Sequence, residues 1–289
     1  MKKNNDKSNK TKELYNKIVE GVTNIIDSGE YQKFLKFCKH FHHYSFNNLV
    51  LIYSQMEDAT RVAGFKTWQK MGRTLKKGSK GIQIIFPIKN TYTKKISGQK
   101  SLLEDDSEIT AKEETIEYLS YRPTYVFDIS QTVGEPIPME NKKLNSDNMT
   151  EFFQFLKSYS PYPILEKNDI GRADGYWSST NQNIVLKESL SIDDKVSVLL
   201  HELTHALYDD FNYKEDRNLS ETFVESVAFI VADYFGLDTS MCSFNYITGW
   251  AKGDIKVVLE LGDKIQKTAK DFVQKLESEF TNNNVKIVA

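Results

Sequence analysis

The apolar positions in the first part of the chain predict two helices. Over residues 12–39 apolar side chains recur every three or four positions, which is the spacing of one helical face. These positions are Leu14, Ile18, Val22, Ile25 and Ile26. Residues 1–10 are polar, and we expect them to form a solvated, disordered tail. A second helix is expected over 45–56, because Ser45 and the asparagines after it offer side chains that can begin a helix.

Two short segments of the same half predict strands. They read IQIIFPI over 82–88 and TYVFDI over 124–129. An acidic block at 104–117 lies between them, and we interpret it as a solvated loop or hairpin that joins the two strands. Prolines and a polar run over 136–148 predict a linker.

The second half is expected to be mainly helical. Helices are predicted over about 149–159, 192–210, 219–235 and 253–280, and one strand is predicted over 182–186. The fold class is therefore α+β with two domains. The first domain, over 11–140, is α+β, and the second, over 141–289, is mainly helical with a small sheet.

Composition and charge narrow the class of protein. The 289 residues are 39% hydrophobic and 27% charged with a net charge of −2, which is typical of a globular protein without bulk attraction to nucleic acid or lipid. Cys38 and Cys242 are far apart, which argues against a disulfide framework and suits a reducing compartment. The start of the chain lacks the apolar core of a secretory signal, and no apolar run could cross a bilayer. We therefore expect a cytoplasmic protein without a membrane partner.

A five-residue motif in the second half predicts a zinc site. Residues 201–205 read His-Glu-Leu-Thr-His. On a helix, His201 and His205 share one face and can reach a single tetrahedral Zn²⁺ ion. Glu202 then points to the open coordination position, where it can act as the general base toward a zinc-bound water. The surrounding residues support a helix, because a Ser191–Asp194 capping pattern precedes apolar residues at helical spacing. The alternative is a helix whose histidines merely pack.

A zinc site of this kind needs a third protein ligand. The remaining histidines, at 40, 42 and 43, lie in the first half, so we expect a carboxylate from the helix over 219–235. Glu221 and Glu225 share a narrow stripe of that helix with Ala228 and Ala232, as the close approach of a second helix requires. We choose Glu221 as the ligand and Glu225 as the residue that orients a histidine, although helical spacing alone allows the reverse. Weaker candidates, expected to face water in the connecting loop, are Asp209, Asp210, Glu215 and Asp216.

A basic segment of the first half predicts contact with nucleic acid. Over residues 59–100 basic side chains occur without any acidic residue, and aromatic residues are interleaved with them. Such a pattern is typical of surfaces that hold single strands through phosphate contacts and base stacking. The candidate contacts are Arg61, Lys66, Trp68, Lys70, Arg73, Lys76, Lys77 and Lys80. The alternative is a solvated basic surface that balances the acidic block, with Trp68 in the core.

The sequence also resembles a known group of proteins. Its second half, through HELTH (201–205), ETFVESVAFIVADYFGLDTS (221–240) and YITGW (246–250), is similar to the zinc peptidase part of ArdC-type antirestriction proteins and, more distantly, to ImmA/IrrE-like peptidases. Phrases at 42–55, 58–82 and 126–138 resemble the N-terminal domain of the same ArdC-like group. The resemblance implies single-stranded-DNA binding by the first half, a place on mobile genetic elements, and Glu221 as the third zinc ligand.

Together these features predict a DNA-associated zinc metallopeptidase of a mobile element, with an unidentified protein substrate. One alternative is a single-stranded-DNA-binding antirestriction protein whose zinc is structural, and another is a regulatory peptidase that cleaves a repressor. Glu202 separates a catalytic from a structural zinc site, because a structural site has no need of a carboxylate at that position.

Overall fold

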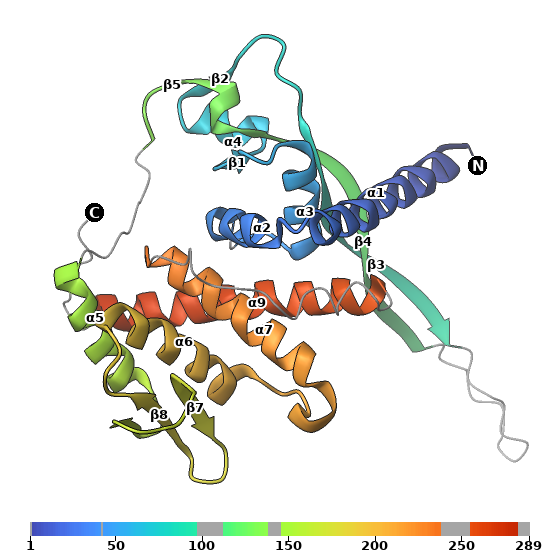
Figure 1. Cartoon of the computed structure of the whole chain (residues 1–289). Helices are drawn as coiled ribbons and strands as arrows, with labels where there is room; N and C mark the ends of the chain where they lie inside the picture. Colours follow the sequence, from blue (N-terminus) through green and yellow to red (C-terminus); the bar gives the residue numbers. More distant parts are fainter. Residues whose placement is uncertain (1, 42, 97–111, 138–145, 238–254, 283–289) are drawn as a thin grey trace, which may run out of the picture.

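The computed structural model of the chain describes residues 2–41, 43–96, 112–137, 146–237 and 255–282, and these residues form an α+β fold (Figure 1). The α+β class predicted from the sequence is thereby confirmed. Cys38 is buried and has a free thiol, as expected, whereas Cys242 lies outside the described residues. Among the helices described, none is both long enough and apolar enough to cross a bilayer.

The first part of the chain folds into α1 (Lys2–Asp27), α2 (Tyr31–Cys38), η1 (Lys39–Phe41) and α3 (Phe46–Gln55). The prediction of one helix over 12–39 is wrong, because Gly29 adopts a φ of 72° and ends α1. The prediction of a tail over 1–10 is also corrected, since α1 begins at Lys2. No proline or glycine interrupts residues 2–20, so the backbone hydrogen bonds of the amphipathic segment continue through its polar start.

A long two-stranded ribbon follows. Strand β3 (Ile82–Ile96) pairs antiparallel with β4 (Lys112–Asp128), in a register that runs from Ile82 opposite Val126 to Ile96 opposite Lys112. The two predicted strands are only the inner ends of this ribbon, which extends away from the helices (Figure 1). Of the acidic block, residues 112–117 belong to β4 and 104–111 lie outside the described residues. Strand β1 (Val62–Ala63) pairs with the other edge of β4.

Helix α3 covers the open edge of β3 with two amides. Asn48 donates to the carbonyl of Ile85 at 2.9 Å and accepts from its N–H at 2.8 Å. About two turns farther along the same face of the helix, Gln55 makes the same pair of bonds to Gln83, at 2.9 and 3.0 Å. These bonds satisfy backbone groups that an edge strand would otherwise leave open to another chain.

A small structural unit closes the base of the ribbon. It consists of α4 (Phe65–Lys70), β2 (Arg73–Leu75), η2 (Ile129–Gln131) and β5 (Thr132–Gly134), with β2 antiparallel to β5. The buried Asp128 accepts hydrogen bonds from the backbone N–H groups of Thr60, Arg61 and Ser130, at 2.8, 3.0 and 2.8 Å. This carboxylate therefore ties the segment before β1 to the end of β4.

The second half packs helices on one small sheet. Helix α5 (Ser146–Tyr159) precedes β6 (Ile164–Lys167), β7 (Gly175–Ser178) and β8 (Asn183–Lys187), which lie in the order β6–β8–β7 with β7 antiparallel at one edge. Helices α6 (Ile192–Tyr208), α7 (Tyr213–Tyr234) and α9 (Ile255–Asn282) complete the described chain. The four predicted helices and the strand at 182–186 are confirmed, with ends within about three residues except that α7 begins six residues before the predicted start. Strands β6 and β7 had not been expected.

The two halves share a contact surface. Helix α9 packs on both α7 and α3, and a Cβ at Gly262 would lie 2.4 Å from the ring of Phe46. The hydroxyl of Tyr31 lies 3.0 Å from that of Ser226, so α2 also meets α7. The boundary predicted near residue 140 falls outside the described residues, and the parts on either side of it contribute to one continuous hydrophobic core.

Candidate metal centre

Helix α6 presents both histidines of the motif on one face. Ser191 caps the helix by accepting the N–H of Asp194 at 3.2 Å, and apolar residues at 196, 199, 200 and 203 anchor the helix in the core. The rings of His201 and His205, four residues apart, lie 4.9 Å from each other. The sequence pattern therefore produces the one-sided pair of imidazoles that it predicted.

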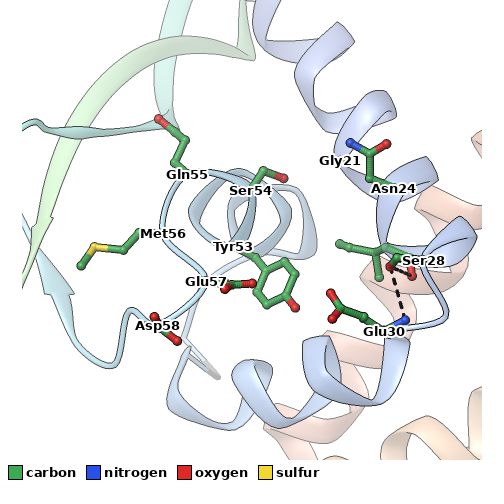
Figure 2. A pocket seen from close by; sticks show the side chains of 11 residues that line it. Gly21, Asn24, Ser28, Glu30, Tyr53, Ser54, Gln55, Met56, Glu57 and Asp58 are labelled. Atoms are coloured by element: carbon green, nitrogen blue, oxygen red, sulfur yellow. Dashed lines mark hydrogen bonds between the residues drawn. The ribbon is translucent and has the colours of Figure 1, made fainter.

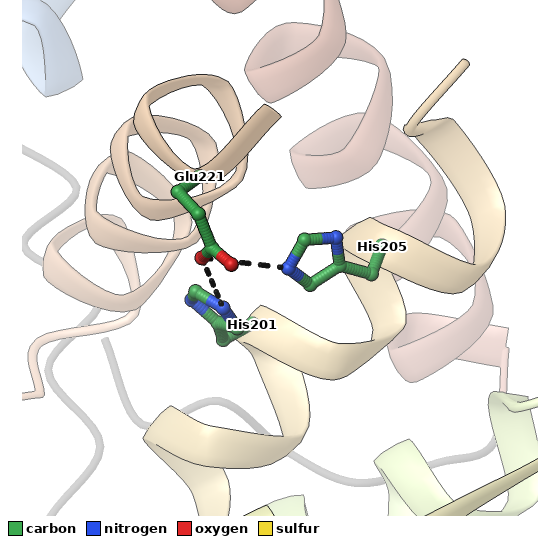
Figure 3. A group of neighbouring side chains, drawn as sticks. All are labelled: His201, His205 and Glu221. Carbon is green, nitrogen blue, oxygen red and sulfur yellow. Dashed lines mark ion pairs between the residues drawn. The ribbon is translucent and has the colours of Figure 1, made fainter. Parts of the chain in front are cut away.

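Helix α7 brings a carboxylate to these rings. Oε2 of Glu221 lies 3.7 Å from Nε2 of His201 and 3.8 Å from Nε2 of His205 (Figure 3). Within the described part of the chain, these three residues are the only group of histidine, cysteine or acidic side chains whose ligand atoms converge in this way, all within 4.8 Å of one another. The choice of Glu221 over Glu225 as the converging carboxylate agrees with this geometry.

The other ring nitrogens are held by a second set of acids. Nδ1 of His201 lies 3.1 Å from Oε2 of Glu225, the position expected for the orienting carboxylate. Nδ1 of His205 lies 2.8 Å from Oδ2 of Asp209, which also accepts a 2.6 Å hydrogen bond from Ser220. Because each Nδ1 is engaged, each Nε2 is directed at Glu221 with its lone pair available to a metal.

Asp209 corrects one prediction. The sequence placed it in a loop facing water, whereas its side chain is 8% exposed and bonded to both His205 and Ser220. It stands four residues after His205 at the end of α6, so it lies on the same face as the histidine. Asp210, by contrast, is exposed and pairs with Lys264.

His205 and Glu221 shift each other's pKa strongly. The hydrogen bond with His205 lowers the pKa of Glu221 to about 2, with Tyr213 adding to the effect against the opposing influence of burial. Burial lowers the pKa of His205, but the bonds to Asp209 and Glu221 and the charge of Glu202 outweigh it and raise that pKa to about 9. Without a metal the site thus holds a proton on His205 where a cation would otherwise sit.

The residues fit a divalent metal. The donor set is two imidazole nitrogens and one carboxylate oxygen, which is one of the sets found in catalytic zinc sites with an open fourth position. Bonds of about 2.1 Å in a tetrahedron would separate the ligand atoms by about 3.4 Å. The observed 3.7 and 3.8 Å from Glu221 to the two histidines need only a small contraction.

Glu202 lies beside this group at a cavity of about 310 Å³. The cavity is bounded by α6, α7 and the segment leading into β7, and its wall includes His201, Glu202 and Glu225. Glu202 is only 7% exposed, and burial raises its pKa against the lowering effect of both histidines and of a backbone hydrogen bond from Trp177. Ala228 and Ala232 also line the cavity. The small residues of the α7 stripe therefore leave room beside the site in addition to allowing α6 to approach.

The structure adds Tyr213 and Arg217, which the sequence did not single out. The hydroxyl of Tyr213 donates to Oε1 of Glu221, the oxygen that does not face the histidines. The guanidinium of Arg217 lies 5.5 Å from the centre of the Tyr213 ring. Helix α7 begins at Tyr213, six residues earlier than predicted, and this early start is what places the ring here. No local sequence signal marks a tyrosine eight residues before a ligand.

The candidate nucleic-acid contacts divide into two groups. Trp68 is fully buried and donates from Nε1 to the carbonyl of Phe127 at 2.8 Å, so it cannot stack on a base. The guanidinium of Arg73 is buried against β5 and the residue that follows it, where it donates to Thr132, Gly134 and Glu135. The prediction of nucleic-acid contact is wrong for these two residues, because they complete the small unit at the base of the ribbon.

The other basic candidates remain at the surface. Arg61 is half-buried, and Lys76 is exposed while donating to the carbonyl of Ser130 at 2.7 Å. The fully exposed lysines are Lys66, Lys70, Lys77 and Lys80. Their placement is compatible with phosphate contacts, and the contacts themselves stay a prediction.

A second cavity, of about 510 Å³, lies in the first half between α1 and the end of α3 (Figure 2). Three carboxylates line it: Glu30, Glu57 and Asp58. Tyr53 is 8% exposed, and its hydroxyl is buried at this cavity with no hydrogen-bond partner among the described residues. Lys33 spans two of the carboxylates, 2.9 Å from Glu57 and 3.9 Å from Glu30. The surplus of negative charge makes this cavity unfavourable for phosphate groups.

Comparison with known proteins finds similarity to antirestriction proteins in part of the sequence and in the fold. Residues 7–127 match the family described as the N-terminal domain of anti-restriction factor ArdC. The chain also resembles two crystal structures of the antirestriction protein ArdC from plasmid R388. The metal-free structure has a TM-score of 0.51 and 19% identity over 81% of this chain and 85% of that one. The Mn(II)-bound structure has a TM-score of 0.50 and 17% identity over 84% of this chain and 86% of that one.

Residues 7–127 are therefore similar to the ArdC N-terminal domain, and the chain shares the overall fold of the R388 protein. It is also 26% identical to the uncharacterized protein pXO2-81 of Bacillus anthracis, over 94% of this chain and 52% of that protein. The chain thus spans about half the length of the curated relative it matches. The predicted match at 246–250 falls outside the residues that the structure describes.

Proposed function

We propose that this protein is an antirestriction factor of the ArdC type. In this proposal the first half binds single-stranded DNA and the second half holds one divalent metal at His201, His205 and Glu221. The match of residues 7–127 to the ArdC N-terminal domain is the observation that carries the proposal. The convergence of the three ligand atoms supports the metal, and the Mn(II)-bound relative is compatible with it.

We propose zinc as the resident metal. Two imidazoles and one carboxylate in a partly buried site suit Zn²⁺ better than Mg²⁺ or Ca²⁺, which prefer oxygen ligands throughout. Metal analysis of protein purified without added metal tests this choice. One zinc per chain is expected, and manganese or iron at that stoichiometry would contradict it.

The metal centre is proposed to be hydrolytic, as in a peptidase. The observation that favours catalysis over a purely structural metal is Glu202, which is buried at the cavity with a raised pKa and takes no part in the ligand set. A bound zinc would supply a Lewis acid that makes a water molecule acidic near neutral pH. Glu202 would accept the proton of that water and return it to the leaving amine. Asp209 and Glu225 would hold the two imidazoles in place throughout.

A transfer assay tests the antirestriction function in cells. The measurement is the entry of an unmodified plasmid into a host that has a restriction system and into a host that lacks it. The wild-type protein should raise entry only into the restricting host, by ten-fold or more. His201→Ala should lose this protection if the metal is required. Equal entry with and without the protein would contradict the proposal.

A further inference from the structure

The rings on which a single strand could stack must lie outside residues 61–80, which supplied the candidate contacts predicted from the sequence. Stacking requires the face of an aromatic ring to be open to solvent. Trp68 is fully buried, so within residues 61–80 the one exposed aromatic ring is the half-exposed Phe65. The cavity of the first half is lined by carboxylates and would repel a phosphate backbone.

The β3–β4 ribbon carries exposed rings instead. Alternate residues of a strand point to opposite faces, so the cross-strand register assigns each ring to one side. Tyr121 and Tyr125 share one face, and they are 53% and 56% exposed. We call this side the tyrosine face; by the register it includes Gln83, Ile85, Pro87, Lys89, Thr91, Glu117, Tyr121, Pro123 and Tyr125. The opposite face carries Phe86, Tyr92 and Tyr118.

The two rings of the tyrosine face are spaced and supported for stacking. They stand four residues apart on one strand, which corresponds to about 13 Å. The ring of Tyr125 lies over Gly81, where an added Cβ would come within 3.0 Å of the ring. A ring that is already held in place loses little freedom when a base stacks on it.

Positive charge lies along the same face. Lys89 is exposed and stands two residues beyond Pro87, the cross-strand partner of Tyr121. At the other end, the exposed Lys76, Lys77 and Lys80 form the turn that leads directly into β3. A strand that follows the tyrosine face from this turn toward Lys89 would therefore meet lysines at both ends and two rings between them.

The opposite face is less suited to the same role. Tyr92 and Tyr118 pack edge to face with ring centres 5.8 Å apart, so each ring already has an aromatic neighbour. In the described part of the chain, ring contacts of this kind do not involve Tyr121 or Tyr125. The free π-faces therefore lie on the tyrosine face together with Lys89, whereas Arg122 stands on the opposite face beside the paired rings.

We infer that the tyrosine face of the β3–β4 ribbon is the surface that binds single-stranded DNA, by stacking bases on Tyr121 and Tyr125 while Lys89 and the turn at 76–80 contact phosphates. This inference rests on the proposed DNA binding and locates it. A ribbon that projects from the helices leaves the strand free to continue past both ends, so sequence preference should be weak.

The test measures binding of a fluorescein-labelled oligo(dT) strand to the full-length protein by fluorescence anisotropy. The double variant Tyr121→Ala with Tyr125→Ala should weaken binding by about 30-fold, on the scale of alanine substitutions at stacking aromatics. Tyr121→Phe with Tyr125→Phe keeps both rings and should stay within about two-fold of wild type. The matched control is Phe86→Ala with Tyr118→Ala, which removes two rings from the opposite face and should also leave binding unchanged.

A second measurement does not depend on the alanine variants. Lys89→Gln should reduce the slope of log affinity against log salt by about one phosphate contact. Wild-type affinity in the tyrosine-to-alanine variant, or an equal loss in the opposite-face control, would overturn the assignment of the face while leaving DNA binding intact. A wild-type protein that does not bind oligo(dT) would overturn the proposed DNA binding together with the inference.

Discussion

Nδ1 of His205 lies 2.8 Å from Oδ2 of Asp209, one helical turn farther along the chain. Ser220 of α7 donates to the same oxygen, so this contact links the end of α6 to the helix that carries Glu221. The pair fixes the direction of the ring before any metal binds, and it keeps a proton on Nδ1 when Nε2 gives up its proton to a metal.

Asp209→Asn should therefore weaken metal binding without removing a ligand. Loss of such a partner typically lowers metal affinity by about 10- to 100-fold, because the ring is no longer oriented and its Nε2 is less basic. The measurement is competition for zinc against a chromophoric chelator. Asp193→Asn is the control, since Asp193 is exposed in the first turn of the same helix. Equal affinities for wild type and Asp209→Asn would show that His205 needs no such support.

Replacement of the two glutamates of α7 should give unequal effects. Glu221→Gln removes the carboxylate that faces both Nε2 atoms, and we expect nearly complete loss of zinc from the purified protein. Glu225→Gln removes only the partner of Nδ1 on His201, and the protein should retain zinc with reduced affinity. Zinc content by mass spectrometry distinguishes the two. The reverse order would mean that Glu225 is the ligand.

Two predicted DNA contacts, Arg73 and Lys70, should differ in their effect on stability because Arg73 is buried and Lys70 is exposed. Arg73→Ala would leave the oxygens of Thr132, Gly134 and Glu135 without their donor in a buried setting, and should destabilise the protein by about 2–4 kcal/mol. Lys70 is exposed, so Lys70→Ala should change the free energy of unfolding by less than about 0.5 kcal/mol. Urea unfolding followed by circular dichroism measures both. Unchanged stability in Arg73→Ala would show that Arg73 is not needed for folding, and it would again be a candidate DNA contact.

Glu166 should make stability depend on acid pH. Hydrogen bonds from Lys195 and then Lys157, at 2.7 and 2.9 Å, lower the pKa of Glu166 below its usual 4.5. A carboxyl whose pKa is lower in the folded state stabilises it above the unfolded pKa and loses this effect as pH falls through the folded pKa. Because the ion pairs are partly solvated, the contribution should be about 1 kcal/mol or less.

The matching variant is Glu166→Gln. Its free energy of unfolding should fall below that of wild type at pH 7, and the difference should disappear as pH drops well below 4.5. Thermal unfolding at several pH values measures this. A constant difference at every pH would assign the effect to packing of the side chain and not to its charge.

The metal site could be predicted from the sequence because its geometry is local. The shared face of His201, Glu202 and His205 depends only on the period of one helix, and that of Glu221 and Glu225 on the period of another. Which of the two glutamates converges on the histidines depends on how α7 packs against α6, which the spacing left open. Asp209 was misplaced even though it continues the four-residue spacing from His205, because the chain leaves the helix at that residue. The spacing was the signal that could have identified it.

The first half was harder to predict because its features depend on tertiary contacts. Trp68 is surrounded in sequence by lysines and polar residues, yet it is buried, and its indole N–H donates to the carbonyl of Phe127 in β4, which is distant in sequence. The outer ribbon was missed for a related reason. A ribbon that projects into solvent has no buried face, so residues 89–96 lack the apolar alternation from which a strand is predicted. The end of α1 could have been predicted, because a glycine such as Gly29 commonly ends a helix.

The role of Glu202 as general base is tested most directly by comparing wild type with Glu202→Gln in cells that carry the protein. The measurement is a proteome-wide search for newly formed protein N-termini, paired with zinc analysis of both purified proteins. We predict new termini with the wild type, none with Glu202→Gln, and one zinc per chain in each, because Glu202 is not a ligand. The same termini from both proteins, or none from the wild type, would contradict a hydrolytic centre in which Glu202 takes the proton from water.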